Sequence, residues 1–284
     1  MKLYCYDNFR GNGMDNKQNL HVHSTYCDGK DTPEAIILEA IDKGFDSLGF
    51  SIHSYHSSSN SQIVTMEKIE AYKKEISRLK QEYAGKFDVF LGIEYEIMSE
   101  HSYQEYEYVI ASVHYLETEY GIKGFDVGLQ ATLDYIQKYF GGDGMRFARK
   151  YYETVASIPE HGDFDVIGHF DLLTKNNEKG RFLDESSKQY LDLAFGAIDA
   201  LKGKIDIFEV NTGAIARGYR TTPYPNMEIL REFRRQGFGV IITSDCHNKL
   251  DLDCYYEEAE EMLREAGFRS KMIFTKEGFR EVGI

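Results

Sequence analysis

The stretch NLHVHSTYCDGKDTPEAIILEAIDKG, residues 19–44, joins a β-prone run to a helical pattern and so predicts a βα unit. Thr32 suits the cap of the helix and Pro33 its first position. In a strand, residues two positions apart point to the same face, so His21 and His23 present their imidazoles side by side. Imidazole is the commonest side-chain metal ligand and the usual proton shuttle. The two histidines are therefore a candidate site whose meaning depends on the rest of the chain.

Strand-like and helical patterns alternate along the remaining sequence. The strand-like runs are 47–53, 87–97, 106–116, 163–173, 205–213, 238–247 and 271–275, and the helical runs are 64–83, 127–140, 144–157, 186–203, 226–237 and 253–267. This alternation predicts an α/β fold with a parallel sheet covered by helices. About seven βα units fit a closed or nearly closed (β/α) barrel, of the TIM-like kind, better than a five- or six-stranded open sheet. Since no linker or repeat interrupts the pattern, we expect one domain over residues 1–284.

Composition restricts the partners. Lys and Arg number 33 against 47 Asp and Glu, and the net charge of −14 disfavours binding to nucleic acid or to an anionic membrane surface. The start of the chain has no apolar signal core, and no apolar run approaches the roughly 18 residues of a membrane span. We therefore expect a cytoplasmic protein that binds neither nucleic acid nor membrane. The four cysteines contain no C-x-x-C pair, so no zinc knuckle is expected.

Histidines and acids fall at the ends of the predicted strands. The candidates are His21, His23, His53, Glu94, His114, His169, Asp245 and His247, with Asp28 just beyond the first strand. In an α/β barrel the carboxyl ends of the strands converge on one face, where active sites are built. Buried histidines and acids without partners would be costly unless something positive bound them. These residues are therefore predicted to meet around metal.

The donor types restrict the metal. A mixture of imidazole and carboxylate suits zinc, manganese or iron better than magnesium or calcium, which prefer oxygen ligands. Nine potential ligands are too many for one tetrahedral ion. The sequence therefore predicts two or three divalent ions that share a bridging carboxylate.

The motifs are also specific as an ordered set. H-x-H followed by Asp-Gly, then FSIH, GIEYE, SVH, IGHFD and SDCH, over residues 21–247, resemble the polymerase and histidinol phosphatase (PHP) superfamily. The length, GIEYE, IGHFDLL and EVNTGA followed by an arginine make the chain similar to the monofunctional histidinol-phosphatases. The resemblance implies a distorted seven-stranded (β/α) barrel with a trinuclear metal centre.

The resemblance also implies how the ligands divide. His21, His23, Glu94 and Asp245 would hold the first metal, Glu94, His114 and His169 the second, and Asp28, His53 and His247 the third. Many superfamily members have another residue where this chain has Asp28, so the third metal is expected to leave first.

The implied activity is hydrolysis of L-histidinol phosphate to L-histidinol and phosphate, a step of histidine biosynthesis. Two nearby metals can hold a bridging hydroxide and polarise the phosphoryl oxygens. The alkoxide of the leaving alcohol needs a metal or a proton. Asp28, His53 and His247 are therefore also predicted to be catalytic, through the third metal or its water, and His56 is a possible acid.

Arginine matches the oxygens of a phosphate. Arg217, after EVNTG, is the first choice for this role, and Arg181, after IGHFDLL, is the second. Glu96, on the same strand face as Glu94, is a candidate for binding the amine or imidazole of the substrate.

The alternatives to the histidinol-phosphatase function are a PHP-type enzyme acting on phosphotyrosine or nucleotides, or a metal-binding protein without catalytic activity.

Overall fold

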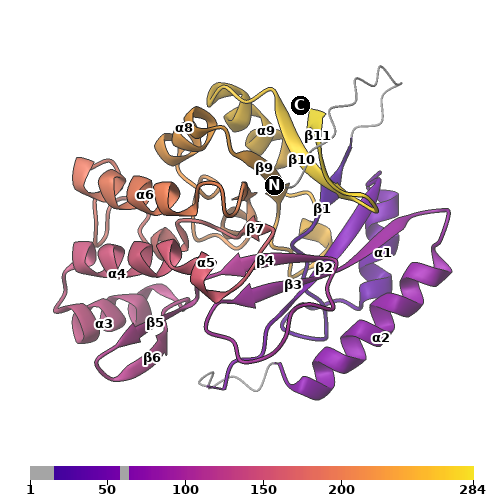
Figure 1. The fold of residues 1–284 in the computed structure, drawn as a ribbon, viewed down its shortest axis with the longest axis horizontal. Helices are drawn as coiled ribbons and strands as arrows, with labels where there is room; N and C mark the ends of the chain where they lie inside the picture. The colour runs from indigo at the N-terminus through magenta and orange to yellow at the C-terminus, as the bar shows by residue number, and fades with distance from the viewer. Residues whose placement is uncertain (1–15, 58–63) are drawn as a thin grey trace.

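Seven parallel strands form a nearly closed barrel in the computed structural model of the chain, which describes residues 16–57 and 64–284 (Figure 1). The strands, in sheet order, are β1 Gln18–Asn19, β2 Ser47–His53, β3 Asp88–Glu96, β4 Tyr108–Ser112, β7 Val166–Ile167, β8 Ile207–Asn211 and β9 Gly239–Thr243. The first and last segments meet at a parallel bridge between Val22 and Cys246. The predicted seven-stranded (β/α) barrel is confirmed.

Helices cover the outside of the sheet (Figure 1). They are α1 Pro33–Asp42, α2 Met66–Glu82, α3 Leu129–Phe140, α4 Gly144–Ala156, α6 Lys188–Leu201, α8 Met227–Gln236 and α9 Tyr256–Glu265, with the short helices α5 Ile158–His161, α7 Gly213–Ala216, η1 Leu172–Thr174 and η2 Lys249–Asp251. The start of α1 is as expected, because Thr32 Oγ1 accepts a hydrogen bond from Ala35 N at 3.3 Å and Pro33 occupies the first turn. Among the described helices, none is long and apolar enough to cross a membrane.

The amino-terminal end of the barrel is filled by apolar side chains. Those inside the barrel are Leu20, Phe90, Tyr108, Ile110, Val166, Ile207 and Ile241. An antiparallel hairpin, β10 Ser270–Thr275 and β11 Gly278–Gly283, adds Phe274, whose ring lies 5.0 Å from that of Phe90. Gln18 Nε2 donates to Phe274 O at 2.8 Å and so fastens this hairpin to β1. The predicted strand 271–275 exists, but it pairs within this hairpin and not with the barrel sheet.

Several predicted strands stop early at the opposite end of the barrel, among them 238–247, whose strand β9 ends at Thr243. The run after Asn19 is extended but pairs only at Val22. The prediction of one strand over 106–116 is wrong beyond Ser112, because the chain turns into a separate hairpin, β5 Tyr115–Thr118 and β6 Gly121–Gly124. Likewise 163–173 contributes only β7, since the backbone N–H of His169 donates to a side chain, Glu209 Oε2, instead of a neighbouring strand.

Candidate metal centre

The nine residues predicted as ligands come together at the carboxyl ends of the barrel strands. Eight of them form three overlapping groups with ligand atoms within 4.8 Å of one another: His23, Asp28, His53 and His247; His21, Glu94 and His169; and His21, His23 and Asp245. The ninth, His114, joins through Glu94, whose Oε1 lies 3.2 Å from His114 Nε2. Parallel pairing positions two members directly, because His53 and Glu94 are register partners on β2 and β3.

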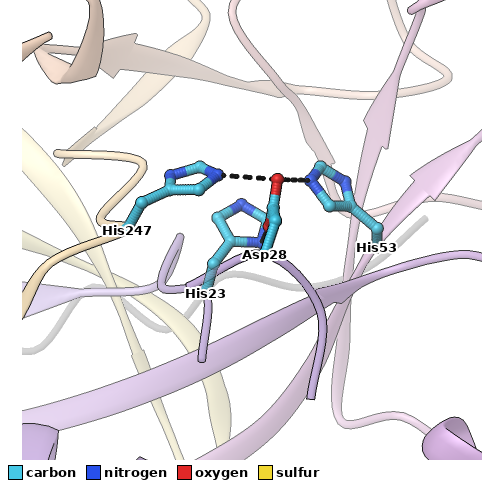
Figure 2. Close-up of side chains that lie close together, drawn as sticks. All are labelled: His23, Asp28, His53 and His247. Atoms are coloured by element: carbon cyan, nitrogen blue, oxygen red, sulfur yellow. Dashed lines mark ion pairs between the residues drawn. The ribbon is translucent and has the colours of Figure 1, made fainter. Parts of the chain in front are cut away.

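Asp28 lies among three imidazoles (Figure 2). Its Oδ2 is 3.2 Å from His247 Nε2 and 3.4 Å from His53 Nε2, and its Oδ1 is 3.8 Å from His23 Nδ1. The following Gly29 has a physical reason, since a Cβ there would lie 2.5 Å from the backbone of His23. The tight turn therefore returns the Asp28 carboxylate to the end of its own strand.

Glu94 is the central carboxylate and is only 1% exposed. Its Oε2 lies 2.8 Å from His53 Nδ1 and 3.3 Å from His21 Nε2. Its Oε1 lies 2.8 Å from His169 Nε2 and 3.2 Å from His114 Nε2. A carboxylate that faces imidazoles on both oxygens is suited to bridge metals, the role that the family resemblance implies for Glu94 and that stays a prediction.

Asp245 occupies a strained backbone position, with φ of 44°. Its Oδ1 lies 3.3 Å from His23 Nε2 and 3.8 Å from His21 Nε2. Its Oδ2 accepts a hydrogen bond from Arg217 Nη2 at 2.8 Å. The unusual φ therefore turns the carboxylate toward three histidines, His21, His23 and His247, and toward Arg217.

The grouping differs in one respect from the division that the resemblance implies. His23 lies with Asp28, His53 and His247 as well as with Asp245, so its imidazole stands between two groups. Which ligand belongs to which metal stays a prediction.

The donor set fits divalent cations. His21 Nε2, His23 Nε2 and Glu94 Oε2 are buried and make no hydrogen bond to the described residues, a costly arrangement for polar atoms. Burial by itself would raise the pKa of Glu94, but His21, His53 and His114 outweigh it and hold the pKa well below its usual range. Glu94 is therefore a charged carboxylate that requires positive partners, and imidazole with carboxylate suits zinc, manganese or iron.

A cleft of about 450 Å³ opens beside Asp28, His53, Glu94 and His114. The β5–β6 hairpin and α3 supply its other wall, which includes the aromatic residues Tyr115, Tyr135 and Tyr139 and the charged residues Lys123 and Asp126. The cleft therefore places an aromatic and polar wall opposite the donor cluster.

The predicted substrate residues lie in different surroundings. The Arg217 guanidinium lies at the edge of the cluster, where Nη1 is 2.8 Å from Asp245 O and 3.1 Å from His247 Nδ1. His56 lines the cleft and stacks on Tyr115, with ring centroids 4.6 Å apart. Glu96 also lines the cleft, but its Oε2 accepts from His114 N at 2.6 Å.

Arg181 is the predicted site residue that the structure does not bring to the cluster. It is exposed after η1, and its guanidinium forms no hydrogen bond or ion pair within the described part of the chain. Its role in phosphate binding stays a prediction.

One buried acid beside the cluster was not predicted as a site residue from the sequence. Glu209, in the middle of the apolar strand β8, contacts the imidazole of His21 at 2.6 Å. A carboxylate between the apolar residues Phe208 and Val210 of a strand-like run was the available signal, but nothing in the spacing indicated its partner.

The barrel and its histidine and carboxylate cluster define an α/β barrel protein with a multinuclear type of metal site. The family model for the PHP domain matches residues 19–213, and the chain belongs to this family.

Relatives are similar over nearly their whole length. A Deinococcus radiodurans protein named "Probable histidinol-phosphatase" is 28% identical over 267 residues, covering 88% of this chain and 94% of the relative. The histidinol-phosphatase of Bacillus subtilis is 24% identical over 265 residues, covering 85% and 97%. A crystal structure of the Lactococcus lactis histidinol phosphate phosphatase, in complex with zinc, L-histidinol and phosphate, has a TM-score of 0.70 at 20% identity, covering 93% of this chain and 98% of that chain.

Proposed function

We propose that this chain is a histidinol-phosphatase, a metal-dependent phosphomonoesterase that converts L-histidinol phosphate and water into L-histidinol and phosphate. The observation that carries the proposal is the meeting of all nine predicted donors beside Arg217 and a cleft at one end of the barrel. The names of the relatives, which cover most of the chain, support the substrate. We propose that residues 1–284 act as one domain.

The ligands of the proposed centre are His21, His23, Asp28, His53, Glu94, His114, His169, Asp245 and His247. When bound, two or three zinc, manganese or iron ions would supply Lewis acidity toward the phosphoryl oxygens and lower the pKa of water toward neutrality. In the reaction, a water oxygen forms a bond to phosphorus, the bond from phosphorus to the alcohol oxygen breaks, and a proton passes to the leaving alcohol.

Arg217 is proposed to bind the phosphate group. Its planar guanidinium matches phosphate oxygens, and its contacts to Asp245 and His247 fix it at the edge of the donor cluster. Removal of its side chain is expected to weaken phosphate-dependent binding.

The leaving alcohol is proposed to occupy the cleft. The primary alkoxide of L-histidinol requires a proton, and Asp28, His53 and His56 are among the titratable groups that line the cleft. The stacked rings of His56 and Tyr115 offer a flat surface for an imidazole, and Glu96 is near enough to the cleft to attract the cationic amine. Asp28, His53 and, through its contact to Asp28, His247 are therefore proposed to serve protonation of the leaving group.

The small phosphate ester is the proposed partner. The cytoplasmic location and the lack of a nucleic-acid or membrane partner stay predictions from charge and from the start of the sequence.

The test is phosphate release by the metal-supplemented chain from L-histidinol phosphate, phosphotyrosine and nucleoside monophosphates. We expect L-histidinol phosphate to have the highest kcat/KM and chelation to abolish its hydrolysis. Preference for phosphotyrosine or a nucleotide would replace the proposed substrate with another one, and no hydrolysis of any ester would favour a metal-binding protein without catalytic activity.

A further inference from the structure

We infer that Glu209 is a positioning residue that holds two ligands of the metal centre in place without binding metal itself. The inference rests on the proposed metal centre and not on the identity of the substrate. Glu209 belongs to β8, and neither this strand nor the segment directly after it supplies any of the nine proposed ligands.

Both oxygens of the Glu209 carboxylate are occupied. Oε1 lies 2.6 Å from His21 Nδ1 and accepts a hydrogen bond from Thr243 Oγ1 at 2.6 Å. Oε2 accepts from the backbone N–H of His169 at 2.6 Å and from Asn211 Nδ2 at 3.0 Å. The residue is 0% exposed, so water does not compete for these contacts.

This arrangement separates Glu209 from Glu94. A carboxylate has about four acceptor positions, and Glu209 uses four of them on protein groups. Glu94 Oε2, in contrast, makes no hydrogen bond to the described residues. Glu209 therefore has no lone pair left for a metal or for a proton from water, whereas Glu94 does.

The contact to His21 decides which nitrogen of the ring can bind metal. Donation of Nδ1–H to the carboxylate leaves the lone pair on Nε2, the atom that lies 3.3 Å from Glu94 Oε2 within the cluster. A carboxylate behind a ligand histidine also fixes the ring orientation and makes the imidazole a better donor. Glu209 therefore prepares His21 for metal before any ion arrives.

The contact to His169 acts on the backbone. The chain leaves the β-ladder after Ile167, and the hydrogen bond from His169 N to Glu209 replaces the one that a neighbouring strand would supply. This bond holds the segment from which the His169 imidazole reaches Glu94 Oε1 at 2.8 Å. One buried carboxylate thus connects ligand-bearing segments that are far apart in the sequence.

The experiment compares Glu209→Gln with Glu232→Gln, a matched change of a largely buried glutamate that pairs with Arg235 on α8. Zinc affinity is measured by competition with a chromophoric chelator, and thermal unfolding is followed on the metal-free proteins. Since loss of such a carboxylate typically weakens metal binding about 10- to 100-fold, we expect that loss for Glu209→Gln and no change for Glu232→Gln.

Zinc affinity separates positioning from a general structural role. If Glu209 only stabilised the fold, Glu209→Gln would lower the unfolding temperature of the metal-free chain and leave the zinc affinity of the folded protein unchanged, which would overturn the inference. If this variant does not fold, Thr243→Val removes one hydrogen bond from Oε1 and is expected to weaken zinc binding severalfold. A wild-type chain that binds no zinc would overturn the proposed centre itself, a result distinct from equal affinities of wild type and variant.

Discussion

The two ends of the barrel are built from opposite kinds of side chain. At the carboxyl ends of the strands, histidines and acids face one another with several buried polar atoms that make no hydrogen bond to the described residues. At the amino ends, Phe90, Tyr108 and Phe274 pack ring against ring, and the β10–β11 hairpin closes the interior.

This difference indicates that the amino end of the barrel stabilises the fold and that the carboxyl end binds ligands. Apolar packing at the amino end supplies free energy of folding, because burial of large side chains is the main favourable contribution. The polar end holds charge and unsatisfied donors at a cost that only a ligand can offset. Changes at the polar end should therefore affect activity more than stability, and changes at the apolar end should do the reverse.

The largest effect is expected for Glu94→Gln. The change removes the charge of the carboxylate that faces five imidazoles, so metal binding loses its central ligand. Several kcal/mol of transition-state stabilisation depend on such ions, which corresponds to a fall in kcat/KM of about 1,000-fold. Phosphate release and metal content per chain measure the result; full activity with an unchanged metal content would contradict the assignment of Glu94.

The next effect is expected for Phe274→Ala, at the opposite end. Replacing a buried phenylalanine by alanine typically lowers the free energy of unfolding by about 3–5 kcal/mol. Urea unfolding of the metal-free chain gives this value, with Tyr120→Ala as a control because Tyr120 is 60% exposed. The kcat/KM of folded Phe274→Ala should equal that of the wild type. A large loss of kcat/KM with unchanged stability would contradict the assignment of stability to the apolar end and activity to the polar end.

A pH-dependent effect is expected for Asp171→Asn near the polar end. Asp171 is fully buried, its Oδ1 has no hydrogen-bond partner among the described residues, and burial raises its pKa to about 7. In the unfolded chain the pKa is about 3.9, so the folded state binds the proton more tightly and the free energy of unfolding falls as pH rises from about 4 to 7.

The asparagine side chain in this variant cannot lose a proton, and the variant therefore avoids this fall. Relative to wild type, Asp171→Asn should gain stability between pH 5 and pH 8, by an amount on the order of 3 kcal/mol. Urea unfolding of the metal-free proteins at both pH values measures it. Asp192→Asn is the control, because Asp192 is exposed on α6. A stability difference that does not change with pH would show that Asp171 is ionised in the folded protein.

Much of the barrel and of the donor cluster could be predicted because each signal is local. The capped helix that begins after Thr32 and the histidines at successive strand ends can be recognised within short windows. The β5–β6 hairpin could not be predicted in this way, since all its residues except Leu116 are exposed or half-exposed and lack the alternation that marks a half-buried strand.

The surroundings of Glu209 and Arg181 could not be predicted from short windows of the sequence. Glu209 matters through His21 and Thr243, which lie 188 and 34 residues away in the sequence, and only the closed barrel brings the three together. Arg181 is an arginine, as phosphate binding requires, and it follows the IGHFDLL motif, but the loop leaves its side chain exposed.

The smallest effect is expected for Gly92→Ala, between the two ends. Gly92 lies inside β3, where glycine normally weakens a strand, and the structure supplies the reason for it. A Cβ at position 92 would lie 2.1 Å from the ring of Tyr108, whose hydroxyl donates to Leu20 O at 2.6 Å inside the barrel. Since overpacking typically costs about 1–3 kcal/mol, Gly92→Ala should lower the free energy of unfolding by that amount.

A double-mutant cycle identifies the cause. If the cost arises from the ring of Tyr108, Gly92→Ala should destabilise a Tyr108→Leu chain by less than it destabilises the wild type. Gly196→Ala, in the interior of α6 where a Cβ meets nothing within 4 Å, is the matched control and should be neutral or stabilising by up to about 1 kcal/mol. Additive costs in the cycle would place the strain elsewhere. Because Glu94 is two residues farther along β3, unchanged zinc affinity in Gly92→Ala would show that strain at the apolar packing does not reach the metal centre.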